Sequence, residues 1–82
     1  MHKAGVETTD GNGEAVVTFN TSHPNTDYFI QLTAGASPDA VICFVKSGTK
    51  TVDGFTLVSF DDGGKKETSV PVYWCMGPYD NP

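Results

Sequence analysis

Histidine, cysteine and carboxylate side chains are the groups in this 82-residue chain with the greatest potential for chemistry. His23 lies four residues before Asp27, which leaves room for a His–Asp pair, but an exposed loop histidine beside Pro24 is the favoured interpretation. The neighbouring acids Asp61 and Asp62 precede a Gly-Gly-Lys-Lys run and are better explained by a solvated loop than by a general acid. We therefore predict no catalytic residue and expect that the protein is not an enzyme.

The candidate metal ligands have none of the spacings typical of a metal site, such as CxxC, HxH or HExxH. A blue-copper site needs two histidines, a cysteine and a weak axial ligand, and no histidine follows Cys75-Met76. The sequence predicts no metal and no cofactor. Cys43 and Cys75 both lie in apolar runs, so we expect two buried free thiols. A disulfide between them is the alternative and requires an oxidising compartment.

Ligand binding is the chemistry that the loops favour. Aromatic rings stack on sugar faces, and amides or carboxylates fix the sugar hydroxyls. We expect the binding loops to be Thr21–Asp27 and Asp61–Lys66, because these connections are the longest and most polar. The candidate ligand-binding residues on them are His23, Asn25, Asp27, Asp61 and Asp62. Further candidates are Tyr28, Tyr73, Tyr79 and Asp53, although a core or interface position is as consistent for Tyr28 and Tyr73.

The charge balance excludes several classes of partner. The chain has five lysines, no arginine and ten acids, for a net charge of −5. An acidic chain repels a phosphate backbone, so we expect no nucleic-acid partner. No apolar run approaches the ~18–20 residues of a membrane span, so we expect no membrane insertion. The first residues contain no apolar segment typical of a signal peptide.

The elements that must position these loops are predicted to be β-strands. Apolar residues alternate with polar ones, and β-branched and aromatic types dominate the runs between Gly, Pro, Asn and Asp clusters. The expected strands span 6–8, 14–20, 28–34, 41–46, 51–60 and 69–76. Six strands at this spacing predict an all-β fold, a six-stranded antiparallel sandwich. We expect one domain over residues 1–82, with its core in 13–77 and a non-regular tail in 78–82.

Alternation also predicts which side chains face the core. Ala15, Val17 and Phe19 share one face of the second strand. The fourth strand is apolar on both faces at its start, which is typical of a strand covered on both sides. Pro71 lies within the last expected strand and favours an edge strand or a bulge there. So short a chain buries a thin core, and oligomerisation would supplement it.

The order of these motifs resembles the H-type lectin-like domain that ends many bacteriophage tail fibres. Its first half is resembled by three features in order: Val17-Thr18-Phe19, then a loop with Pro24, then Tyr28-Phe29-Ile30-Gln31-Leu32. Lys50-Thr51-Val52-Asp53-Gly54-Phe55-Thr56-Leu57 resembles the family's K-T-x-x-G-F-x-V strand, and Val72-Tyr73-Trp74-Cys75-Met76-Gly77 its terminal V-x-W-x-A-x-G. The motif residues carried over are Val17, Phe19, Gly54, Phe55, Trp74 and Gly77. We expect Phe19, Phe55, Leu57 and Trp74 in the core, Gly54 at a bend where the fifth strand begins, and Gly77 after the last strand.

The resemblance implies a function as well as a fold. The family's domain is a six-stranded sandwich that typically forms a homotrimer at the tip of a fibre and binds a receptor, often a polysaccharide, on the bacterial surface. It implies a virion protein, made in the host cytoplasm, with a host cell-surface glycan or receptor as partner. Two alternatives stay open: a purely structural trimerisation cap that contacts no receptor, and a secreted lectin, which a Cys43–Cys75 disulfide would favour.

Overall fold

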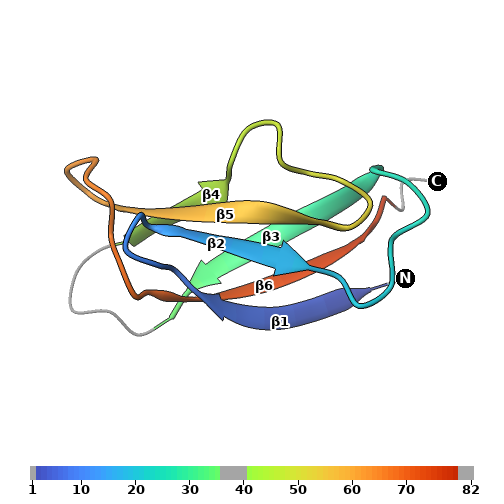
Figure 1. Cartoon of the computed structure of the whole chain (residues 1–82), viewed down its shortest axis with the longest axis horizontal. Helices are drawn as coiled ribbons and strands as arrows, with labels where there is room; N and C mark the ends of the chain where they lie inside the picture. The colour runs from blue at the N-terminus through green and yellow to red at the C-terminus, as the bar shows by residue number, and fades with distance from the viewer. Residues whose placement is uncertain (1, 36–40, 80–82) are drawn as a thin grey trace.

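The computed structural model describes residues 2–35 and 41–79. These residues form six strands, all paired in the antiparallel sense (Figure 1). The strands are β1 (Lys3–Thr8), β2 (Glu14–Thr18), β3 (Tyr28–Ala34), β4 (Val41–Val45), β5 (Gly54–Asp61) and β6 (Pro71–Pro78). The predicted all-β antiparallel sandwich is confirmed. No helix in the described part of the chain is long and apolar enough to cross a membrane.

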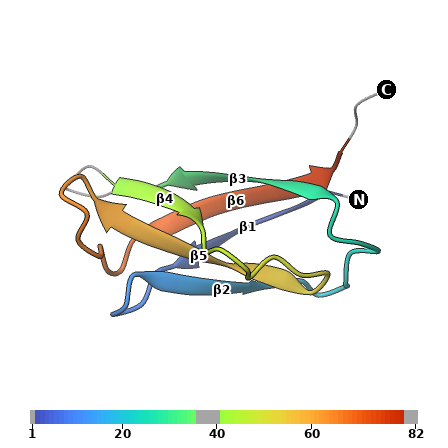
Figure 2. The same cartoon turned by 90° about the horizontal axis from the view of Figure 1, so that it is seen from above.

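The strands form two three-stranded sheets that pack face to face. Sheet A has the order β1-β6-β3 and sheet B the order β2-β5-β4, and they lie as two layers in Figure 2. Each sheet turns one face to the other sheet, so inward apolar residues alternate with outward ones along each strand. The core between the layers consists of Ala15, Val17, Phe19, Tyr28, Phe55, Leu57, Val70, Val72 and Met76.

An aromatic cluster fills one half of this core. Phe19 lies 5.8 Å from Tyr28, 6.1 Å from Phe55 and 6.0 Å from Trp74 between ring centroids, and its contacts with Tyr28 and Phe55 are edge-to-face. Phe55 also meets Trp74 edge-to-face at 5.7 Å. Such pairs contribute about 0.5–1.5 kcal/mol beyond area burial. The predicted core residues Phe19, Phe55 and Leu57 are buried, and Trp74 packs against them half-buried.

The last strand is central rather than at an edge. β6 pairs with β1 on one side and with β3 on the other. The expectation of an edge strand from Pro71 is therefore wrong. Pro71 is the first residue of β6, opposite Thr8, and a proline is tolerated at the start of a strand.

The fourth strand is covered on one face only. β4 is an edge strand of sheet B. Its outward residues Ile42 and Phe44 remain 54% and 49% exposed. The expectation that β4 is covered on both sides is therefore wrong for the described residues.

Two motif glycines occupy crowded positions. Gly54 begins β5 with φ of 147°, and a Cβ there would overlap the carbonyl oxygen of Val17. Only glycine adopts this backbone readily. Gly77 lies inside β6 opposite Phe29, where a Cβ would collide with the His2 ring. The expectation that Gly77 follows the last strand is therefore wrong. The expected non-regular tail in 78–82 is also wrong at its first residue, because Pro78 belongs to β6. Residues 80–82 lie outside the described part of the chain.

Candidate functional site

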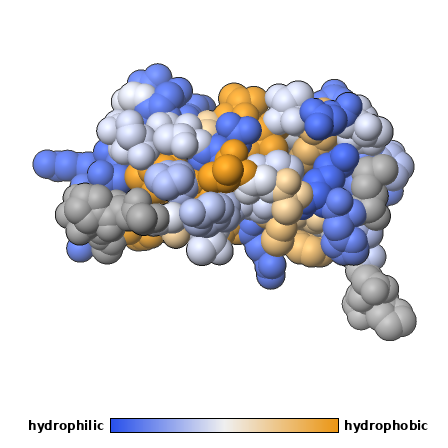
Figure 3. Space-filling model, turned by 90° about the horizontal axis from the view of Figure 1, so that it is seen from below, coloured by the Kyte–Doolittle hydropathy of each residue, from blue (hydrophilic) through white to orange (hydrophobic). Residues whose placement is uncertain are grey.

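The strand pairing separates the two predicted binding loops. Residues 19–27, between β2 and β3, lie beside residues 46–53, between β4 and β5; we call this pair of connections the His23 end. The loop Asp61–Lys66 lies at the opposite end of the sandwich (Figure 1). Asp61 and Asp62 thus cannot share a site with His23, Asn25 and Asp27. On the face that Figure 3 shows, hydrophilic surface gathers towards both ends and apolar surface lies between them.

His23 is buried and joins the two connections of the His23 end. Its side chain is 4% exposed, and its backbone N–H donates to the Val52 carbonyl at 2.7 Å. With a proton on Nδ1, the ring donates to the Asn25 carbonyl at 2.9 Å, and it packs 5.2 Å from the Tyr28 ring. The expectation of an exposed loop histidine is wrong. No hydrogen bond joins the ring to Asp27 in the described residues, so His23 acts as a structural link.

Further hydrogen bonds make this end rigid. The Phe19 N–H donates to the Asp53 carbonyl at 2.8 Å, and the Ser22 hydroxyl donates to the Asp53 carboxylate. The Asn25 side-chain oxygen accepts from the Asp27 N–H at 2.9 Å, so the Asn25 amide shapes the turn while the Asp27 carboxylate lies exposed. These bonds order polar loop groups before any partner arrives, which lowers the entropic cost of binding.

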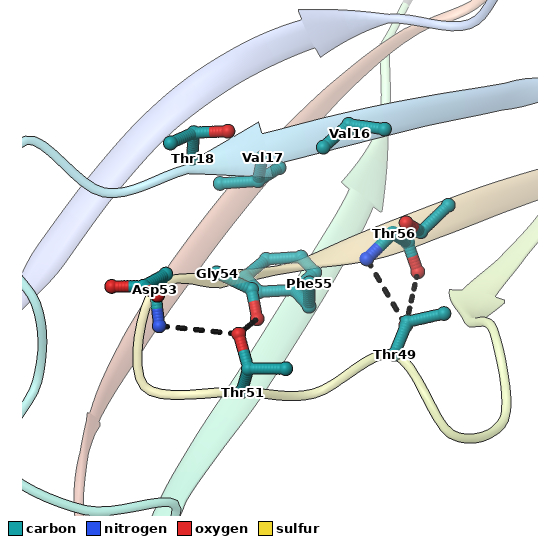
Figure 4. A pocket seen from close by; sticks show the side chains of 9 residues that line it. All are labelled: Val16, Val17, Thr18, Thr49, Thr51, Asp53, Gly54, Phe55 and Thr56. Carbon is teal, nitrogen blue, oxygen red and sulfur yellow. Dashed lines mark hydrogen bonds between the residues drawn. The ribbon is translucent and has the colours of Figure 1, made fainter.

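A hollow lies beside these loops on the outer side of the sandwich. Gly54 and its neighbours border an open volume of about 190 Å³. Figure 4 shows β2 along one side of the hollow, the connection 46–53 along the other and Gly54 between them. The lining residues are Val16, Val17, Thr18, Thr49, Thr51, Asp53, Gly54, Phe55 and Thr56.

The threonines around this hollow differ in their hydrogen bonding. The Thr49 hydroxyl donates to the Lys46 carbonyl at 2.7 Å, and the Thr51 hydroxyl to the Gly54 carbonyl at 3.2 Å. These two side chains stabilise the connection 46–53 and its junction with β5. Among the described residues, the hydroxyls of Thr18 and Thr56 have no hydrogen-bond partner. Together with the exposed Asp53 they give the hollow both donors and acceptors.

The hollow is large enough to hold part of a ligand. Enclosing pockets for drug-sized ligands measure ~300–1,000 Å³, so this smaller, open hollow has room for one ring or side group of a larger molecule. Hydroxyl and carboxylate groups match the hydroxyls of a polyol, and the exposed Val16 provides an apolar edge. In the part of the chain that the structure describes, no group of three metal-ligating side chains gathers anywhere.

The opposite end uses its polar groups to fold. The Asp61 carboxylate accepts from the backbone N–H groups of Gly63 and Lys65, both at 2.9 Å. The buried Ser59 hydroxyl donates to the Glu67 carbonyl at 2.6 Å. Of the two predicted ligand-binding acids here, Asp61 shapes its own turn, whereas Asp62 is exposed.

A second hollow opens between the edge strands β1 and β2. It measures about 260 Å³ and is lined by Lys3, Ala4, Thr18, Phe19, Asn20 and Trp74. The Lys3 ammonium lies 5.4 Å from the Phe19 ring centroid. The indole N–H of Trp74 is buried without a partner in the described residues, beneath Gly5, whose Cβ position would lie 3.0 Å from it.

The cysteines are free and lie on different sides of their sheets. Cys43 faces the core from sheet B, while Cys75 lies on the outer side of sheet A, with its Sγ 3.5 Å from the Gln31 side-chain oxygen. Both are half-buried rather than fully buried. Burial raises the pKa of the Cys43 thiol above its usual value. The free thiols of the sequence analysis are therefore present, although less enclosed than expected.

Sequence reasoning named Asp53 but missed the threonines. Thr18, Thr49, Thr51 and Thr56 come from three separate segments, and only strand pairing brings them together. Gly54 was the available signal, because a glycine in a strand often marks the close approach of another backbone, here that of Val17. No family model, curated protein or solved structure matched this chain in the three comparisons.

Proposed function

We propose that this chain is the receptor-binding tip domain of a bacteriophage tail fibre, a homotrimer that attaches to a polysaccharide or another receptor on the bacterial surface. The observation that carries the proposal is the hollow at the His23 end, where the Asp53 carboxylate and two threonine hydroxyls without a hydrogen-bond partner among the described residues are exposed beside a hydrogen-bonded frame. The order of motifs in the sequence supports the same function.

The chemistry of the hollow favours a carbohydrate over other ligands. Asp53 accepts hydrogen bonds from sugar hydroxyls, and Thr18 and Thr56 both donate and accept. Their frame is held by backbone bonds from Phe19 and His23, so binding costs little ordering entropy. Weak, shallow sites of this kind gain strength when several copies act together, which is the advantage of a trimeric fibre tip.

The structural cap is the second candidate, and a specific observation favours it. Ile42 and Phe44 leave apolar surface on the outer face of sheet B, which serves assembly whether or not a receptor is bound. The secreted lectin has less support, because the two cysteines that a disulfide would join are free.

The decisive experiment measures binding of the full chain to bacterial surface polysaccharides. Purified lipopolysaccharides from a panel of bacteria are immobilised, and binding is followed by biolayer interferometry. We expect Asp53→Asn to weaken binding about tenfold or more, because a charged hydrogen bond contributes ~1.5–3 kcal/mol. Asparagine still accepts from Ser22, so the fold is preserved.

Asp62→Asn is the matched control, since it removes one exposed carboxylate at the opposite end. Its binding should equal that of the wild type. If Asp62→Asn weakens binding and Asp53→Asn does not, the assignment of the binding site to the His23 end is wrong. If the trimer binds no polysaccharide and no whole cells across the panel, the receptor-binding proposal is wrong and the structural cap is favoured.

A further inference from the structure

The hollow between β1 and β2 meets the hollow at the His23 end only at Thr18, which borders both. It measures about 260 Å³, below the ~300–1,000 Å³ of a pocket that encloses a drug-sized ligand. It therefore has room for one ring and its substituents. The two hollows also differ in charge, because Asp53 lines the first, whereas the second is lined by a lysine and by no acid.

The Trp74 indole reaches this hollow because β1 carries a glycine above it. Gly5 of β1 pairs directly with Trp74 of β6, and residues directly opposite one another in an antiparallel pair project from the same face of the sheet. A Cβ at Gly5 would lie 3.0 Å from the indole nitrogen, so the ring occupies the space that a side chain there would fill. The indole thus extends beneath β1, and its N–H is a buried donor without a partner among the described residues.

Lys3 brings a positive charge to the hollow, and it makes no ion pair within the described residues. Its ammonium lies 5.4 Å from the Phe19 ring centroid. Lys46, by comparison, pairs with Glu14 at 3.3 Å. A cation–π contact attracts an ammonium to the ring face but supplies no counter-charge. The hollow therefore holds a cation that can still take an anionic partner.

The other polar side chains of the hollow are available as well. Thr18 and Asn20 are both exposed, and neither the hydroxyl nor the amide makes a hydrogen bond within the part of the chain that the structure describes. Each of these groups can donate and accept. Together with the ammonium they form a site with more donors than acceptors, which suits a ligand that carries both a carboxylate and hydroxyls.

We infer that this hollow binds the ring of an acidic sugar, a uronic acid. The Lys3 ammonium takes the carboxylate in a charge-assisted hydrogen bond, which is roughly twice as strong as a neutral one. Thr18 and Asn20 bind ring hydroxyls, while the apolar face of the sugar lies against the aromatic side of the hollow. The inference goes beyond the proposed function, because it requires neither a trimer nor a ligand at the His23 end, where the Asp53 carboxylate repels an anion.

Titration of the isotope-labelled full chain with sodium glucuronate, at constant ionic strength and followed by NMR, tests the site. The chain has a single tryptophan, so its indole N–H gives one signal that reports on this hollow. We expect this signal and the amides of Lys3, Thr18 and Asn20 to shift along one saturable curve. Glucose lacks the carboxylate and acetate lacks the ring, so each should bind at least about tenfold more weakly.

Two variants and a control test the residues. Lys3→Gln removes the charge and keeps most of the side-chain length, and we expect it to weaken glucuronate binding about tenfold. Lys65→Gln is the matched control, since Lys65 is an exposed lysine in the loop at the opposite end, and its affinity should equal that of wild type. Asn20→Ala, in an exposed loop, should also weaken binding, and it serves as the test if Lys3→Gln fails to fold.

Each contrary result overturns a defined part of the inference. An indole signal that stays unchanged at the highest glucuronate concentration overturns the site, as does equal binding by wild type and a folded Lys3→Gln. Equal weakening by Lys65→Gln would reduce the effect to general charge attraction. Glucose that binds as tightly as glucuronate overturns the role of the carboxylate, and acetate that does so overturns the sugar. The interferometry of Asp53→Asn is a separate measurement, so either proposal can fail while the other stands.

Discussion

The phenolic hydroxyl of Tyr28 donates a hydrogen bond to the carbonyl oxygen of Thr51 at 2.7 Å. Tyr28 is the first residue of β3 in sheet A, and Thr51 belongs to the connection that leads into β5 of sheet B. The Lys50 ammonium lies above the same ring, 5.0 Å from its centroid. One buried side chain therefore ties both sheets to the frame of the hollow.

Replacing Tyr28 by phenylalanine should loosen this end. Tyr28→Phe removes the hydroxyl that donates to the carbonyls of Thr51 and Gly54, so we expect a loss of about 1 kcal/mol in the free energy of unfolding. Urea denaturation followed by Trp74 fluorescence measures it. Tyr73→Phe alters an exposed tyrosine and should leave the stability unchanged. Equal stabilities of Tyr28→Phe and wild type would show that the bond contributes nothing.

Tyr28 should also make the fold sensitive to alkali. Burial raises the pKa of its phenol above the ordinary value of 10.0. Because the folded pKa is the higher one, its stabilising effect is complete below pH 10 and is lost as the pH rises through the folded pKa. Thermal melts from pH 8 to pH 11.5 should therefore fall more steeply for wild type than for Tyr28→Phe. Parallel curves for the two proteins would contradict this account.

The collision at Gly54 predicts a large effect of a single methyl group. Gly54→Ala sets a Cβ against the Val17 carbonyl, and we expect it to destabilise the fold by at least about 3 kcal/mol. Gly48→Ala is the matched control, because Gly48 also has positive φ, 79°, but open space around it. It should cost only about 1 kcal/mol for the strained backbone. Similar losses in both variants, measured by urea denaturation, would contradict a steric role for Gly54.

The two thiols should differ in reactivity. The Cys43 thiol faces the core, and burial raises its pKa. Because the thiolate is the reactive form, a raised pKa lowers the reactivity of Cys43. Iodoacetamide at pH 8 should therefore modify Cys75, on the outer side of sheet A, several-fold faster than Cys43. Peptide mass spectrometry after timed quenching measures both rates. Faster modification of Cys43 would mean that sheet B opens at β4.

Local alternation predicted much of the fold, because it depends on neighbours in sequence. Ala15 and Val17 face the core as expected, with Val16 between them pointing outward. Strand order could not be predicted in this way. Pro71 suggested an edge strand, yet β6 is central. Proline lacks a backbone N–H, and this lack is tolerated in a central strand when the proline is the first residue.

The site was less predictable than the fold, because it depends on contacts between distant segments. His23 was expected in solvent, but its bond to Val52, 29 residues further along the chain, encloses it. Asp27 lies on a polar loop and Asp61 ends β5 just before another, and composition does not reveal that these loops occupy opposite ends. The threonines of the hollow become neighbours only through the register of β2 with β5.

The most direct test of the central claim is to map a bound polysaccharide fragment on the protein by NMR. The isotope-labelled chain is titrated with oligosaccharides released from the lipopolysaccharide that binds best in the interferometry panel. We predict that amide shifts change at Thr18, Asp53 and Thr56 and remain unchanged at Asp61 and Asp62. Changes confined to the Asp61–Lys66 loop, or no change at saturating oligosaccharide, would contradict a receptor site at the His23 end.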